Sequence, residues 1–97
     1  MIDFLLDCGI NKDTINELNK KYPTELFDLS CNKKEIVKII NYLRDIGVMD
    51  IDELLTYETW LFYKTLDFVK ERITKFDVNE LVSKINSNYE EIGIILS

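Results

Sequence analysis

Apolar residues in the middle of the chain recur with the period of an α-helix. In residues 31–48 they are separated by steps of 3, 1, 3 and 3, and they are Ile36, Ile39, Ile40, Leu43 and Ile46. This spacing places all of them on one side of a helix. Residues 59–76 repeat the pattern, with steps of 4, 3, 4 and 3 from Phe62 to Phe76. The sequence therefore predicts two long amphipathic helices, each of which needs other helices to cover its apolar side.

Shorter helical patterns surround these two helices. Asn32, Thr59 and Asp77 are predicted N-caps, because a short polar side chain can accept a backbone N–H at a helix start. Gly47 suits the left-handed position that ends a helix. The apolar segment 92–97 is expected to form a last turn of the core rather than a strand. The inward residues of the shorter helices are expected to be Ile15, Leu18, Ile51, Leu54, Leu55, Val78, Leu81, Val82 and Ile85.

The chain also repeats itself. "LLDCGI" at 5–10 is similar to "LRDIGV" at 43–48, and "YPTELF" at 22–27 is similar to "YETWLF" at 57–62. A fainter third copy begins at "VNELV". Helical units that recur every 30 to 40 residues are typical of stacked α-repeats. We therefore predict one all-α helical-repeat domain over 1–97, with about six short helices in two and a half units, approximately 1–30, 31–62 and 63–97.

At these residues the chain resembles the repeat of the mitochondrial transcription termination factor (mTERF) family. That unit has a helix ending in a Leu-x-x-x-Gly-hydrophobic phrase, a second helix, and a Pro-x-x-Leu turn that forms a third, tighter helix. The first copy matches at Gly9, Pro23 and Leu26, whereas Glu58 replaces the proline in the second copy. The resemblance implies a stacked helical fold that binds nucleic acid. The residues for that role would be Lys33, Lys34, Lys38 and Arg44 on the first long helix.

Charge favours a different partner. The chain carries a net charge of −6, which repels phosphate backbones and disfavours general nucleic-acid binding. The acids are concentrated in residues 50–62, and both Asp52 and Glu53 are expected to face solvent. We therefore predict a non-enzymatic regulatory module that contacts a protein partner through an acidic surface, for example an inhibitor or DNA mimic from a mobile element. The candidate protein-binding residues are Asp50, Asp52, Glu53, Glu58 and Trp60.

Two roles remain open for Trp60, since it can belong to the core between helices or serve as an exposed interface anchor. Catalysis is not expected, because the chain has no histidine and no Gly-rich phosphate loop. We interpret the acid pairs Asp50/Asp52 and Glu90/Glu91 as helix-start or solvated acids. The sequence thus predicts no catalytic residue, no metal site and no cofactor.

Cys8 and Cys31 are not spaced as a metal or redox motif, and we expect both to be buried, reduced thiols. Reduced thiols suit the cytoplasm. The chain lacks the run of roughly 20 apolar residues that a membrane span requires, so no membrane contact is expected. The sequence leaves the oligomeric state open, although a dimer is one way for so short a chain to bury more surface.

Overall fold

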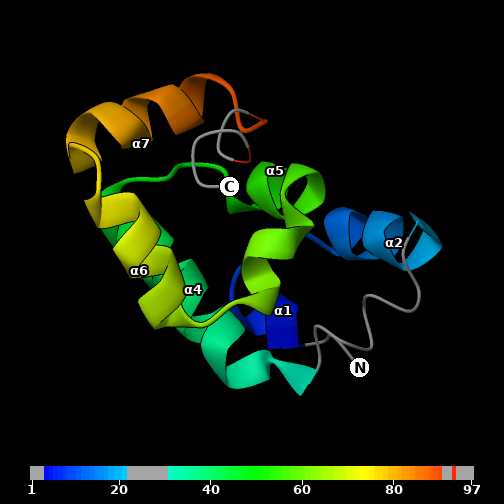
Figure 1. The fold of residues 1–97 in the computed structure, drawn as a ribbon. Helices are drawn as coiled ribbons and strands as arrows, with labels where there is room; N and C mark the ends of the chain where they lie inside the picture. Colours follow the sequence, from blue (N-terminus) through cyan, green and yellow to red (C-terminus); the bar gives the residue numbers. More distant parts are fainter. Residues whose placement is uncertain (1–3, 22–30, 91–92, 94–97) are drawn as a thin grey trace.

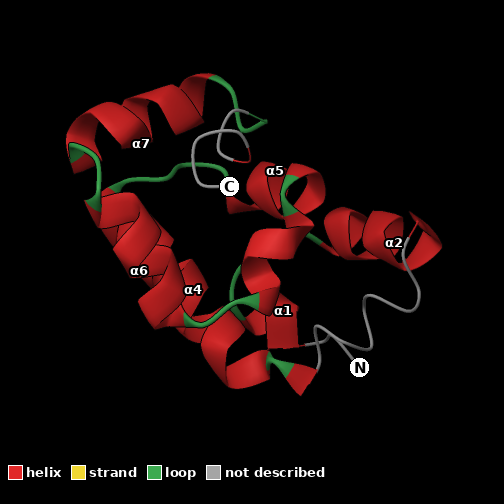
Figure 2. Cartoon of the chain, in the orientation of Figure 1, coloured by secondary structure: helices red, strands yellow, loops and turns green. Residues whose placement is uncertain are grey.

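The predicted apolar stripes form the helices of the molecule, and the fold is all-α as predicted (Figures 1 and 2). Residues 4–21, 31–90 and 93 are described by the computed structural model, and this part of the chain contains no β-strand. The helices are α1 (Phe4–Asp7), α2 (Lys12–Lys21), α4 (Lys33–Ile46), α5 (Ile51–Tyr57), the 3₁₀ helix η1 (Thr59–Tyr63), α6 (Leu66–Thr74) and α7 (Val78–Ser87).

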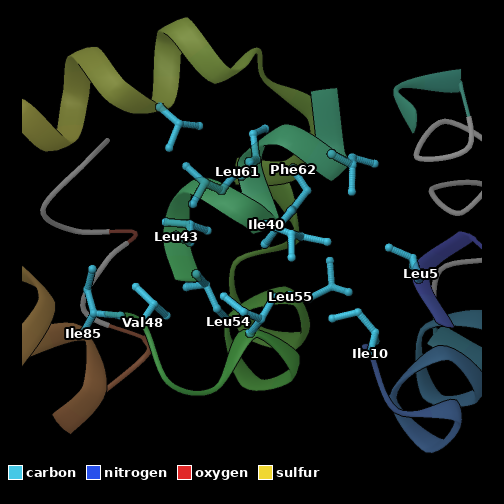
Figure 3. Close-up of a cluster of buried hydrophobic side chains, with 14 of the residues drawn as sticks. Leu5, Ile10, Ile40, Leu43, Val48, Leu54, Leu55, Leu61, Phe62 and Ile85 are labelled. Atoms are coloured by element: carbon cyan, nitrogen blue, oxygen red, sulfur yellow. The ribbon is translucent and has the colours of Figure 1, made fainter. Parts of the chain in front are cut away.

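α4 is the central helix, and it packs against α5, η1, α6 and α7 (Figure 1). Its predicted stripe is fully buried except at Ile46, which is half-buried. α2 packs against α5 instead. Figure 3 shows Leu43 of α4, Leu54 of α5 and Ile85 of α7 in one apolar cluster, which Leu5 and Ile10 extend toward the N-terminal helices.

Two glycines end helices in the same way. Gly9 and Gly47 have φ angles of 85° and 109°, which confirms the prediction of a left-handed residue at Gly47. The N–H of Val48 donates to the carbonyl oxygen of Leu43 at 2.9 Å, and Ile10 makes the equivalent bond to Leu5 at 3.0 Å. These bonds form a Schellman motif after each helix. The two turns are therefore alike, but residues 22–27 lie outside the described part of the chain, and the repeat as a whole stays a prediction.

Several helix boundaries agree with the sequence. The carboxylate of Asp77 accepts the N–H of Glu80 at 3.2 Å, so the predicted cap of α7 is confirmed. Asn32 occupies the N-cap position of α4, but its side chain does not cap that helix. Its amide instead donates to the carbonyl oxygens of Phe62 at 2.8 Å and Lys64 at 3.1 Å. Asn32 therefore joins the start of α4 to the end of η1.

The second long helix begins later than predicted. Thr59 starts the 3₁₀ helix η1, and the cap of α6 is Thr65, whose hydroxyl accepts the N–H of Phe68 at 3.1 Å. Lys64 and Thr65 are extended, so the apolar period does not run continuously across them. As a result Phe62, Val69 and Ile73 are buried as the pattern indicates, while Leu66 is half-buried and Phe76 is exposed.

The cysteines are both free, and Cys8 is half-buried. The prediction of a buried thiol is wrong for Cys31, which is exposed because it precedes α4 and lies outside the apolar stripe. None of the described helices is long and apolar enough to cross a membrane. Of the predicted C-terminal turn at 92–97, only Gly93 lies within the described residues.

Candidate functional site

α5 has one buried face and one exposed face. Ile51, Leu54 and Leu55 point into the core, as predicted. The exposed face carries Met49 and Tyr57, with 83% and 52% of their surfaces accessible, and the acids between them. Glu53 and Tyr57, four residues apart in α5, lie on the same side of that helix, and Met49 and Asp50 continue this line in the residues that directly precede the helix. We call this line the α5 stripe, and its members are Met49, Asp50, Glu53 and Tyr57.

The two acids of the α5 stripe differ in their bonding. Asp50 caps α5, since its carboxylate accepts the N–H of Glu53 at 3.1 Å, and it remains exposed. The carboxylate of Glu53 has no hydrogen-bond or ion-pair partner among the residues that the structure describes, and it is exposed as predicted. Glu53 is therefore the charge of this surface that is most available to a partner.

The end of α7 fixes the turn that presents Met49. The side-chain oxygen of Asn86 accepts the N–H of Met49 at 2.9 Å, and its amide donates to the carbonyl oxygen of Gly47 at 3.0 Å. The phenol oxygen of Tyr89 accepts the N–H of Asp50 at 3.0 Å. Burial raises the pKa of Tyr89; the hydrogen bond from the Asp50 N–H opposes this rise, and the charges of Asp50 and Glu53 add to it. The backbone of the turn is held while the Met49 side chain projects outward.

Asp52 serves a structural role, in contrast to the expectation that it faces solvent. It is half-buried, and its carboxylate accepts the backbone N–H of Asn11 at 3.3 Å and the side-chain amide of Asn11 at 2.6 Å. Asn11 immediately precedes α2, so Asp52 ties α5 to the start of that helix. Asp50 and Asp52 are thus turned toward different partners and do not form a joint site.

Glu58 and Trp60 bind each other. The indole Nε1 of Trp60 donates to Glu58 Oε2 at 2.5 Å, and Gly93 lies directly against that carboxylate. A Cβ atom at Gly93 would be 2.5 Å from Glu58 Oε2. Trp60 is half-buried and packs against the core, so it is neither fully internal nor an exposed anchor. This pair lies outside the α5 stripe.

The basic candidates on α4 are also divided. Lys33, Lys34 and Lys38 are exposed, and Lys38 pairs with Glu35 at 3.3 Å. Arg44 instead donates to the carbonyl oxygen of Cys8 and lies against Gly9. Its guanidinium therefore helps to hold α1 on α4, although the residue is exposed like the three lysines.

A second line of side chains, which the sequence did not indicate as a site, runs from the end of η1 across α6. Lys64 and Phe76 at its ends are exposed, whereas Phe68 and Arg72 within α6 are half-buried. Phe68 lies between two cations, with Lys64 Nζ at 5.3 Å and Arg72 Cζ at 5.0 Å from its ring centre. Phe76 follows with 44% of its surface accessible. Steps of four residues connect these positions, and this spacing was the available indication in the sequence. We call this line the α6 stripe, and its members are Lys64, Phe68, Arg72 and Phe76.

No protein-family model, curated protein or solved structure matches this chain. The resemblance to the mTERF repeat therefore stays a prediction that rests on the residues quoted above. Within the described ranges, no group of three or more His, Cys, Asp or Glu residues is arranged to hold a metal ion.

Proposed function

We propose that this chain is a non-enzymatic binding protein of the cytoplasm, which contacts a basic surface of another protein through the α5 stripe. One observation supports this proposal above the others. The carboxylates of Asp50 and Glu53 are exposed, and two accessible apolar side chains, Met49 just before α5 and Tyr57 at its end, flank them in the sequence. Acidic residues flanked by Met and an aromatic side chain provide both the charge and the apolar contact that an interface needs.

The two kinds of side chain contribute differently to binding. Burial of Met49 and Tyr57 against a partner removes apolar surface from water and supplies most of the affinity. The acids orient the partner and increase the association rate. Because Asn86 and Tyr89 already hold the turn at Met49, little backbone ordering is needed on binding. A nucleic-acid enzyme is one suitable partner, since its basic groove would accept an acidic inhibitor that mimics DNA.

Nucleic-acid binding is the second candidate function, and the arrangement of α4 and α6 favours it. The exposed Lys33, Lys34 and Lys38 lie on α4, which packs against α6. Lys70 Nζ of α6 lies 5.3 Å from the ring centre of Tyr42 on α4, so a cation and an aromatic ring also meet between these two helices. Such combinations bind single strands in other proteins. The net charge of −6 opposes this function.

Site-specific crosslinking tests the proposed function. A photoreactive phenylalanine analogue at position 57 should label a protein in cells of the native host, and Glu53→Lys should remove that adduct. The same analogue at the exposed position 20 of α2 is the control and should not give this adduct. Labelling of nucleic acid from position 57, or an equal adduct from position 20, would contradict the assignment of the α5 stripe.

A further inference from the structure

The two stripes match each other in order and in spacing. Along α5 the order is Met49, Glu53, Tyr57, and along α6 it is Phe68, Arg72, Phe76. Each has a charge between two apolar side chains at steps of four residues, and the two charges are opposite. Met49 precedes α5 and Phe76 follows the end of α6, so the match is one of order and of spacing in the sequence.

We propose that the α5 stripe of one molecule docks on the α6 stripe of a second copy of this chain. This inference rests on the proposed function, because it names the partner of the same surface. Glu53 would then meet Arg72, and the flanking apolar side chains of one stripe would cover those of the other. A pair related by a two-fold axis makes this contact twice, whereas a head-to-tail assembly makes it once for each neighbouring pair.

Exposed apolar surface supports this docking. Four large hydrophobic side chains are exposed among the described residues, and three of them, Met49, Tyr57 and Phe76, belong to the two stripes. The fourth is Leu6 on α1. The contact would therefore cover most of the large exposed hydrophobic groups of the described chain, which gains the free energy of apolar burial.

The charge at the centre of each stripe is suited to direct contact. Arg72 is stacked on Phe68, with Cζ 5.0 Å from the ring centre, and this stacking reduces the freedom of its guanidinium. A stacked guanidinium still directs N–H groups from its edge, which is the geometry that a carboxylate accepts. Glu53 has no partner of its own within the described part of the chain. Each charge thus lacks a strong ion pair that docking would first have to break.

Salt distinguishes a second copy from a foreign basic partner. Two copies, each with a net charge of −6, repel each other at long range, while Glu53 and Arg72 attract at contact. Screening acts over about 30 Å at about 0.01 M salt, about 8 Å at about 0.15 M and about 3 Å at about 1 M. Self-association should therefore be strongest at intermediate salt. Binding to a basic partner should instead weaken steadily as salt is added. For such a partner, the long-range interaction of the net charges and the short-range contact of Glu53 are both attractive, and salt screens both.

Sedimentation of the purified full chain, with charge reversals, tests the inference. The wild-type chain should associate as its concentration rises toward about 1 mM, because single-helix contacts of this kind are weak. Glu53→Lys and Arg72→Glu should each raise the dissociation constant about tenfold or more. The double variant Glu53→Lys/Arg72→Glu should regain association, because the opposite charges face each other again. An equimolar mixture of the two single variants should regain it for the same reason.

Matched controls separate the local contact from net charge. Glu17→Lys and Lys20→Glu on the exposed side of α2 change the net charge by the same amounts as the two stripe variants. They should leave the dissociation constant within about twofold of wild type, since distant surface charges are screened. Circular dichroism checks that each variant folds. If a charge-reversal variant does not fold, the neutral variant Arg72→Gln or Glu53→Gln takes its place.

Three results would overturn the inference: a wild-type chain that stays monomeric, stripe variants that behave like the α2 controls, or a double variant that does not regain association. The crosslinking experiment separates this failure from failure of the proposed function. An adduct from position 57 at twice the 11.5-kDa mass of the chain supports self-docking. An adduct with a different protein alone, together with a monomeric purified chain, would retain the α5 stripe as a binding surface and overturn the second-copy assignment.

Discussion

The carboxylate of Glu35 on α4 accepts a hydrogen bond from the backbone N–H of Leu66, with an O–N distance of 3.1 Å. Leu66 is the first residue of α6, so a side chain from one helix satisfies an unpaired N–H at the start of another. Lys38 pairs with the same carboxylate at 3.3 Å. The hydrogen bond from Leu66, and then the bond and charge of Lys38, lower the pKa of Glu35 below its ordinary value of 4.5.

The first prediction concerns the pH dependence of stability. Because the pKa of Glu35 is lower in the folded chain than in the unfolded chain, its stabilising effect is fully present above pH 4.5. The effect is lost as the pH falls through the folded-state pKa. Glu35→Gln should therefore be less stable than wild type at pH 7 in urea unfolding, and the difference should shrink below pH 4.5.

Glu17→Gln provides the control for that measurement, because it removes the same charge from an exposed position on α2. It should unfold like wild type at both pH values. A stability difference for Glu35→Gln that is the same at neutral and acidic pH would show that the carboxylate charge does not act through Leu66.

The second prediction compares two leucines that the sequence pattern treats alike. Leu43 is fully buried on α4, whereas Leu66 is half-buried at the start of α6. Leu43→Ala should reduce the free energy of unfolding by about 2–5 kcal/mol, because it leaves a cavity in the core. Leu66→Ala should cost less, about 1–2 kcal/mol, since less surface is buried there. Urea unfolding measures both, and equal losses would contradict the break between η1 and α6.

The sequence predicted the features that depend on local chemistry. The period of the α4 stripe identified its buried residues, because a helix places them on one face whatever packs against it. Asp77 was identified as a cap because its partner, the N–H of Glu80, is three residues away. Gly47 was assigned a left-handed conformation because glycine adopts it without steric cost.

Features that depend on distant residues were not predicted. The partner of Asp52 is Asn11, 41 residues away, and the partner of Arg44 is the carbonyl of Cys8, 36 residues away. A single sequence does not indicate which distant backbone groups need a hydrogen bond. Both side chains were therefore assigned to exposed surfaces, although they hold the first two helices on the rest of the fold.

The third prediction separates Asp52 from Glu53. Asp52→Ala should lower the free energy of unfolding by about 1–2 kcal/mol, because the N–H of Asn11 loses its acceptor at the start of α2. Glu53→Ala should change it by less than about 0.5 kcal/mol, as expected for an exposed side chain without a partner. Hydrogen exchange should also become faster in the first turn of α2 for Asp52→Ala alone. Equal effects of the two variants would contradict the structural role of Asp52.

The last prediction decides between the two candidate functions. At low salt the chain should show no measurable binding to duplex or single-stranded nucleic acid, because its net charge is −6 and Arg44 is bonded to Cys8. If binding does occur, Lys33, Lys34 and Lys38 are the exposed bases of α4 that can neutralise phosphates. If these three lysines each neutralise one phosphate of a single strand, the logarithm of the binding constant should fall with the logarithm of the salt concentration with a slope of about −2. Fluorescence titration over a range of salt measures this slope. Binding with that slope, which Lys34→Glu/Lys38→Glu abolishes and Glu53→Lys preserves, would replace the acidic protein-contact function with nucleic-acid binding through α4.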